Sequence, residues 1–368
     1  MTQSSRRNFL KTTSAGVVGF AGLADLEAKA SSAPSKEIIA QVKALEARKD
    51  LASTADWNDH LAYPIPYKNP DAQGKERGLA LGGGGMPLIA WYAGYFTALK
   101  KQGIDLSSAD VMVGTSAGAV MAAMLKAGHL WRLADEIDFF ADFPTLLGKM
   151  MPAVELNPSQ KRAIHLDVTA KDAFPQTIQG IGRAAMASLN LDGVSKYYEV
   201  TKKLLTSSEW AQGVFITAND CYTGERIVVS KANNLPINVA CAASSSLPGQ
   251  LGPTFLKDRL CMDGGICQTS THSDVIAGVK RAIVISLGDG TINEQRQGLR
   301  TSTMPNTVNQ EVKDLEAGGT KTKHIVVGLP PGISKVENLV DPKWIAPFLK
   351  YGNDRGIADA QMMKAFWI

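Results

Sequence analysis

Short apolar runs that end at glycine alternate with helical spacings through the middle of the chain. Arg77–Leu81 and Ala109–Val113 each have the pattern of a buried strand, and glycine follows both directly. Apolar residues at helical spacing then predict helices over Ile89–Lys101 and Ala117–Lys126. Strands that alternate with helices predict a mainly parallel sheet that is covered on both faces.

The strand pattern returns in the second half of the chain. A turn is predicted at Thr223-Gly224, between the first two of these later strands. The expected strands are Val214–Ala218, Arg226–Val229, Leu260–Met262 and Arg281–Leu287.

The stretch 143–212 has a different pattern from its surroundings. It has helical spacing, it is rich in Met, Leu and Ala, and Pro152, Pro158 and Pro175 interrupt it. We therefore expect a helical cap inserted into the α/β domain. Its Met-rich side chains would either line a channel for an apolar ligand or pack as ordinary core, and the second is the simpler explanation.

The N-terminus has the pattern of an export signal. Ser5–Lys11 matches the twin-arginine signal, and a mildly apolar stretch over 14–24 and an A-x-A site ending at Ala30 follow it. Residues 1–30 are therefore predicted to be a signal peptide, with a disordered basic tail as the alternative. The signal implies a bacterial source, a twin-arginine translocase as export partner, and a periplasmic or secreted mature protein.

The rest of the chain divides into three predicted parts. Residues 31–76 form an N-terminal arm, with a helix over Ser35–Asp50 and a linker over Tyr63–Gly74. The main α/β domain is expected over 77–290, and 291–368 is expected to be a C-terminal extension packed on it.

The composition excludes several classes of function. With 45% hydrophobic and 20% charged residues among 368, the chain is an ordinary globular protein. Its formal net charge of +4 gives no reason to expect nucleic acid as a partner. The four cysteines form no CxxC pair or Cys/His cluster, so no metal site and no cofactor is predicted, and disulfides stay open. After the N-terminal signal, no apolar run is long enough to span a bilayer.

The segment Gly114-Thr115-Ser116-Ala117-Gly118 has the form G-x-S-x-G between a predicted strand and a predicted helix. A nucleophile at such a sharp turn needs small neighbours, which Gly114 and Gly118 supply. The start of the helix favours a developing negative charge. Ser116 is therefore the candidate nucleophile.

A run of four glycines, 82–85, follows the strand Arg77–Leu81. Successive glycines let backbone N–H groups point at one spot. A phosphate cradle would need Gly-Lys-Ser/Thr or G-x-G-x-x-G, and neither is present. An oxyanion hole for a serine nucleophile is the favoured interpretation, with a simple tight turn as the alternative.

Asp263-Gly264-Gly265 follows the strand Leu260–Met262. An aspartate at the end of a strand would be able to lie beside Ser116, although a turn aspartate that caps local N–H groups is common. A Ser-His-Asp triad of the α/β-hydrolase type would need a later histidine, and His272 and His324 are the candidates. The sequence around neither histidine indicates a catalytic role.

These motifs, in this order, resemble the patatin-like phospholipases. The resemblance covers about residues 77–290 and joins the glycine run, G-T-S-A-G and D-G-G. Two connecting pieces also match, Ile216–Glu225 as a strand-turn-strand and Cys241–Gly249 as an A-S-x-x-x-P-G segment.

The resemblance implies a three-layer α/β/α fold and a Ser-Asp dyad. Ser116 would be the nucleophile and Asp263 would accept its proton, while Gly83, Gly84 and Gly85 would donate to the oxyanion. The implied activity is hydrolysis of fatty acyl esters in lipids, on membrane-surface lipid or another ester, without a cofactor.

One departure from the family pattern keeps other functions open. Many members have a basic residue and then glycine after the glycine run, and this chain has Met86-Pro87-Leu88 there. The basic residue that would lie near a lipid phosphate is therefore absent, and the sequence does not predict which lipid head group is preferred. The alternatives are an esterase with a Ser-His-Asp triad and a non-catalytic lipid-binding protein of the envelope.

Overall fold

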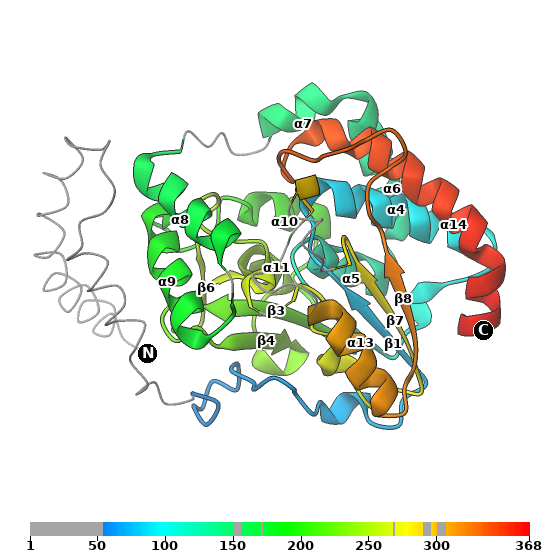
Figure 1. Ribbon diagram of the computed structural model, residues 1–368, viewed down its shortest axis with the longest axis horizontal. Coiled ribbons are helices and arrows are strands. Elements are labelled where there is room, and N and C mark those ends of the chain that lie inside the picture. The colour runs from blue at the N-terminus through cyan, green and yellow to red at the C-terminus, as the bar shows by residue number, and fades with distance from the viewer. Residues whose placement is uncertain (1–53, 151–155, 171, 268, 290–295, 300–306) are drawn as a thin grey trace, which may run out of the picture. The chain divides into compact units, whose positions relative to one another are not determined.

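The computed structural model describes residues 54–150, 156–170, 172–267, 269–289, 296–299 and 307–368 (Figure 1). All of them lie in one compact unit, Asp50–Ile368. The predicted signal peptide and the predicted helix over Ser35–Asp50 lie outside the described residues.

A single mixed sheet organises this unit. Its five parallel strands run in the order β3-β2-β1-β7-β8, and β4 and β6 both pair antiparallel with β3, followed by β5 on β6. The predicted mainly parallel sheet is confirmed, while β5 and β8 are additions to it. The strands are β1 (Arg77–Leu81), β2 (Val111–Gly114), β3 (Val214–Asp220), β4 (Arg226–Ser230), β5 (Thr254–Leu256), β6 (Arg259–Asp263), β7 (Arg281–Ser286) and β8 (Lys321–Val326).

Helices cover both faces of the sheet, as the three-layer prediction requires. The helices are α4 (Gly85–Lys101), α5 (Ala117–Lys126), α6 (Leu130–Asp142), α7 (Pro144–Met150), α8 (Pro158–Thr169), α9 (Pro175–Ala185), α10 (Tyr198–Leu205), α11 (Ile237–Ser244), α13 (Thr307–Ala317) and α14 (Ile345–Trp367) (Figure 1).

The strands alternate their side chains between two apolar cores, as period-2 geometry demands. Leu79 and Leu81 of β1 join the large core formed with α4, α5, α6, α11 and α14. Ala80, between them, faces the smaller core that includes Val308 and Leu315 of α13. Because both faces are buried, β1 has a continuous apolar sequence.

Helix α4 begins earlier than the sequence predicts. The expected start was Ile89, but the helix begins at Gly85 and takes Met86, Pro87 and Leu88 into its first turn. Proline fits there because the first turn of a helix does not use its N–H groups internally. The departure from the family pattern is therefore compatible with a regular helix.

The predicted cap contains α7, α8, α9 and α10. Pro158 and Pro175 are the first residues of α8 and α9, so they start helices rather than interrupt one. Asn157 and Gln160 close a reciprocal capping box at the start of α8. Pro152 lies outside the described residues.

The C-terminal helix α14 packs directly on α4 (Figure 1). A Cβ on Gly94 would overlap the carbonyl oxygen of Leu349, and a Cβ on Gly352 would overlap that of Trp91. The two backbones therefore approach each other more closely than larger side chains allow. Phe348 of α14 is fully buried in the large core, and Trp367 near the end of the helix donates to the Asp105 carbonyl at 3.2 Å.

Two buried arginines connect the segment that precedes β1 to the sheet. Arg259 Nε lies 2.6 Å from Asp59 Oδ2. Arg226 Nη2 donates to the Pro64 carbonyl at 2.6 Å, and its Nη1 lies 2.6 Å from Asp274 Oδ1. Both guanidinium groups are almost fully buried. Such charges are retained inside a protein only when they are paired and hydrogen-bonded, as these are.

Candidate active site

Ser116 occupies a sharp turn between β2 and α5. Its backbone has φ 53° and ψ −118°, which is unusual for a residue other than glycine, and it is the N-cap of α5. A Cβ on Gly114 would overlap the Gly118 carbonyl, and a Cβ on Gly118 would overlap that of Leu81. The turn therefore requires both glycines of the G-x-S-x-G motif.

Asp263 is the last residue of β6 and lies next to Ser116. Its Oδ1 accepts the Gly265 N–H at 2.8 Å, whereas its Oδ2 is buried and has no hydrogen-bond partner of regular geometry in the described part of the chain. The Ser116 hydroxyl is nevertheless close enough to lower the pKa of this carboxyl. We infer a contact looser than a formed hydrogen bond, which is common before substrate binds.

The environment of Asp263 is typical of a catalytic base. Burial raises the pKa of Asp263 from 3.8 to about 7, and the Gly265 N–H and the Ser116 hydroxyl oppose that increase. A carboxyl with a pKa near neutrality is able both to accept and to return a proton at that pH.

The glycine loop faces the same point. A Cβ on Gly83 would lie 3.1 Å from Ser116 Cβ, so the loop passes directly over the serine. Within the described residues, the N–H groups of Gly83, Gly84 and Gly85 have no hydrogen-bond acceptor. The start of α4 therefore carries three N–H groups without an acceptor there, beside the serine, where the positive end of the helix dipole also lies.

The next N–H of this loop is already occupied. Met86 donates to the carbonyl oxygen of Leu339 at 2.8 Å, and a Cβ on Gly85 would overlap that same oxygen. The C-terminal extension therefore crosses the glycine loop and sets its outer boundary.

Three further residues hold the site together and were not assigned a role from the sequence. Ser244 Oγ accepts the Ser116 N–H at 2.8 Å, Tyr92 donates to the Gly82 carbonyl at 3.0 Å, and Asn219 donates to the Asp263 carbonyl at 2.6 Å. Ser244 and Asn219 lie in the two connecting segments that resemble the family, so the signal was present in those motifs. Tyr92 lies within an apolar helix, and no sequence motif indicates its role.

The structure does not support either histidine as the base. His272 Nε2 lies 2.8 Å from the Gly264 carbonyl oxygen. His324 Nε2 lies 2.8 Å from Ser286 Oγ, whose proton goes to the Gly288 carbonyl. Burial lowers the pKa of both rings, to about 4 for His272. Neither forms a hydrogen bond to Ser116 within the residues described.

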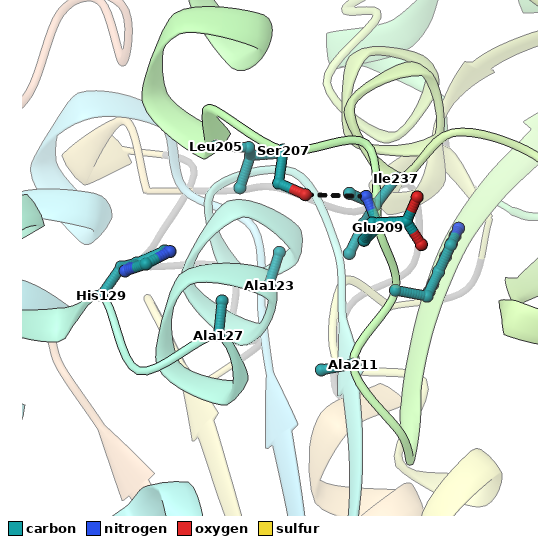
Figure 2. A pocket seen from close by; sticks show the side chains of 9 residues that line it. Ala123, Ala127, His129, Leu205, Ser207, Glu209, Ala211 and Ile237 are labelled. Atoms are coloured by element: carbon teal, nitrogen blue, oxygen red, sulfur yellow. Dashed lines mark hydrogen bonds between the residues drawn. The ribbon is translucent and has the colours of Figure 1, made fainter.

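A pocket of about 220 Å³ lies elsewhere, near the C-terminal end of α5 (Figure 2). Ala123 lies seven residues after Ser116 in the sequence, which corresponds to about 10 Å along a helix. The pocket is therefore separate from the serine. It is lined by Ala123, Ala127, His129, Leu205, Ser207, Glu209, Trp210, Ala211 and Ile237.

Within the described residues, no three His, Cys, Asp or Glu side chains gather in a way that would hold a metal ion. All four cysteines lie in this part of the chain, and they are buried and not joined as disulfides. None of the helices described combines the length and the apolar run needed to cross a membrane.

Several solved structures resemble this chain at low identity. VipD from Legionella pneumophila aligns with 79% of this chain and 67% of its own, at 13% identity and a TM-score of 0.39. ExoU, in its complex with SpcU from Pseudomonas aeruginosa, aligns with 79% of this chain at 15% identity and a TM-score of 0.32. This chain spans only 53% of the matched ExoU chain.

A search of curated protein sequences gives no match. The family model of the patatin-like phospholipases, in contrast, matches residues 79–275, which is more than half of the chain and includes the glycine loop, Ser116 and Asp263. The chain belongs to the patatin-like phospholipase family.

Proposed function

We propose that this protein is a serine acyl hydrolase that cleaves fatty acyl ester bonds of lipids with a Ser116–Asp263 dyad. One observation carries the proposal: the strained Ser116 turn faces a buried carboxylate oxygen that has no regular hydrogen-bond partner among the described residues. The glycine loop supports it, because it passes beside Ser116 at Gly83 and the N–H groups of Gly83, Gly84 and Gly85 have no acceptor among the described residues, which leaves them as donors for a tetrahedral oxyanion.

The proposed reaction has two halves. Ser116 Oγ attacks the ester carbonyl carbon while its proton moves to Asp263, and the glycine N–H groups stabilise the oxyanion. As the intermediate collapses, the carbon–oxygen bond to the leaving alcohol breaks and Asp263 returns the proton to that alcohol. Water then attacks the acyl-enzyme with Asp263 as base, which releases the fatty acid and restores Ser116.

The cap favours a lipid surface as the place of reaction. Four large apolar side chains on it are strongly exposed, Phe143, Val168, Phe174 and Leu191. Two of them, Val168 and Phe174, lie on α8 and at the N-cap of α9, which pack on each other, and neighbouring exposed apolar groups are typical of sites that meet a membrane or a partner. We propose that the cap meets the surface of lipid aggregates.

Release of free fatty acid from mixed phospholipid vesicles tests the proposal. The chain from Ser31 onward is expected to release fatty acid, and Ser116→Ala is expected to lose at least about 10³-fold of the rate. Ser207→Ala, in the separate pocket, is the matched control and keeps full activity. Release that persists in Ser116→Ala would contradict the proposed nucleophile.

The activity is expected to depend on pH through Asp263. Only the ionised carboxylate accepts a proton, and burial raises its pKa to about 7. For a short-chain chromogenic ester, kcat/KM is therefore expected to rise about tenfold per pH unit below pH 7 and to level off above it. Glu311→Gln is the control for the midpoint, because burial raises the pKa of Glu311 to about 7 as well. The pH profile of that variant should keep its midpoint near pH 7, whatever its rate. A midpoint near pH 4 would exclude a buried base.

We also propose that the protein is exported by the twin-arginine pathway. The proposal is based on Arg6 and Arg7 within Ser5–Lys11, in a part of the chain outside the described residues. Replacing both arginines with lysine is expected to leave the precursor in the cytoplasm, as cell fractionation measures. Normal export of that variant would contradict it.

A further inference from the structure

The chain after Asp263 returns to the active site as a second loop, Thr269–His272. A Cβ on Gly82 would lie 3.0 Å from Ser270 Oγ, and a Cβ on Gly83 would lie 3.7 Å from Ser270 Cβ. This loop therefore touches the glycine run on one side. On its other side it reaches the Asp263-Gly264-Gly265 segment through His272.

His272 makes that second contact from a constrained position. It is 1% exposed, its φ is 44°, and its Nε2 lies 2.8 Å from the Gly264 carbonyl oxygen. A carbonyl only accepts, so Nε2 carries the proton and donates it. Desolvation by burial, and secondly the Arg226 charge, lower the pKa of His272 to about 4, so the ring is neutral near pH 7. The nitrogen without a proton is Nδ1, which is buried and makes no hydrogen bond among the described residues.

The carbonyl that His272 holds belongs to the residue directly after Asp263. A Cβ on Gly264 would lie 2.6 Å from both Thr217 O and Thr217 Oγ1, so Gly264 is pressed against β3. The Asp263 N–H donates to Ser246 O at 3.0 Å. Removal of the ring would leave the Gly264 carbonyl buried without a donor and open space behind it.

Glu311 of α13 holds the backbone on both sides of His272. Its Oε2 accepts Thr271 Oγ1 at 2.6 Å, and it accepts both the N–H and the hydroxyl of Ser273 at 3.0 Å. Glu311 as a residue is only partly buried, but its carboxylate end is enclosed by these three donors. A helix of the C-terminal extension thereby fixes a residue that the sequence places 39 positions earlier.

We propose that His272 is a positioning residue for Asp263, acting through the Gly264 carbonyl, and that Glu311 keeps His272 in place. The proposal rests on the proposed function of Asp263 as base. It assigns a catalytic purpose to part of the C-terminal extension, and it gives His272 a role other than that of a triad base.

Kinetics of four variants test the proposal on a short-chain ester, with active enzyme counted by fluorophosphonate titration. His272→Leu fills the space without a donor and is expected to lower kcat about 10- to 100-fold with little change in KM. His272→Gln keeps an N–H donor at a similar place and is expected to return kcat to within about threefold of wild type. Glu311→Ala is expected to lower kcat as well, and His272→Leu/Glu311→Ala is expected to be no slower than His272→Leu alone.

The outcomes separate three roles for the ring. Equal inactivity of the Gln and Leu variants would overturn the proposal in favour of a triad base, because glutamine cannot accept a proton. Unchanged kcat per active site, with only a lower melting temperature, would overturn it in favour of a purely structural role. If the losses of kcat in the two single variants multiply in the double variant, the two residues act independently, and the proposal that Glu311 acts through His272 is overturned.

The protonation state and tautomer of the His272 ring are measured independently of turnover. Long-range ¹H–¹⁵N NMR of histidine-labelled protein, assigned with His272→Gln, is expected to show a neutral Nε2–H tautomer from about pH 5 to about pH 9. A ring that titrates near pH 7 would overturn the proposal. If the wild type neither hydrolyses esters nor reacts with fluorophosphonate, the proposed function fails and the catalytic purpose of His272 fails with it. The NMR signal then still shows whether the ring holds Gly264.

Discussion

Asp263→Asn is expected to remove almost all hydrolysis and, at the same time, to make the folded protein more stable at pH 8. The amide cannot accept the Ser116 proton, so kcat/KM should fall by about 10³-fold. Burial of the ionised carboxylate raises its pKa from 3.8 to about 7, and the amide removes the cost of burying that charge. At 1.36 kcal/mol per pKa unit, the gain in the free energy of unfolding is at most about 4 kcal/mol.

The gain should itself depend on pH. The native protein binds the Asp263 proton more tightly than the unfolded chain does, so the wild type loses stability as pH rises from about 4 to about 7. Below about pH 4 both states are protonated, and the carboxyl carries no penalty. The difference between Asn and wild type should therefore be small at about pH 4 and complete above about pH 7, as urea unfolding at several pH values measures.

Asp258→Asn is the matched control for this experiment. Asp258 is exposed on the turn before β6, so the same chemical change should alter neither activity nor stability. An Asp263→Asn protein that is less stable than wild type at pH 8, or that keeps more than about a tenth of the activity, would contradict a buried catalytic carboxylate.

Gly118→Ala is expected to destabilise the fold by about 3 kcal/mol or more. A Cβ at this position would overlap the Leu81 carbonyl oxygen and lie 2.8 Å from that of Gly82. Both obstacles are backbone atoms of β1 and the glycine loop, so they cannot yield as a flexible side chain would. The variant should melt at a clearly lower temperature and should lose activity even where it is folded.

Gly180→Ala is the control for a methyl group added within a helix. Gly180 lies in α9, and a Cβ there would have no atom within 4 Å. Alanine should therefore be neutral or stabilise by up to about 1 kcal/mol through helix propensity. Equal melting temperatures for Gly118→Ala and wild type would show that the turn around Ser116 tolerates a wider separation from β1.

The sequence predicts the centre of the fold well because its signals there are local. Two strands there end directly in glycine. The strand Arg77–Leu81 is followed by the glycines at 82–85, and the strand before Ser116 is followed by Gly114. Helix α5 has the bounds predicted, Ala117–Lys126. Apolar spacing places the start of α4 at Ile89, four residues late, because the first helical turn contains glycine and Pro87, which the turn accepts but which carry no helical signal.

What the sequence leaves open depends on contacts between distant segments. Strand β8 has the exposed, Lys-rich pattern of a sheet edge, which periodicity does not distinguish from a loop. The Leu339 carbonyl meets Met86, and Glu311 holds the loop of His272, across separations on which local patterns carry no information. The first contact does not follow from residue type, because every residue has a backbone carbonyl, and the carboxylate of Glu311 has the same sequence pattern as one that faces solvent.

Mapping the site of a fluorophosphonate adduct tests the central claim most directly. The wild-type chain from Ser31 onward is incubated with the probe at about pH 8 and digested, and the peptides are analysed by mass spectrometry. We predict one adduct, on the peptide that contains Ser116, formed about 10³-fold more slowly in Asp263→Asn. No adduct, or an adduct on another serine such as Ser207, would contradict the assignment of Ser116 as nucleophile.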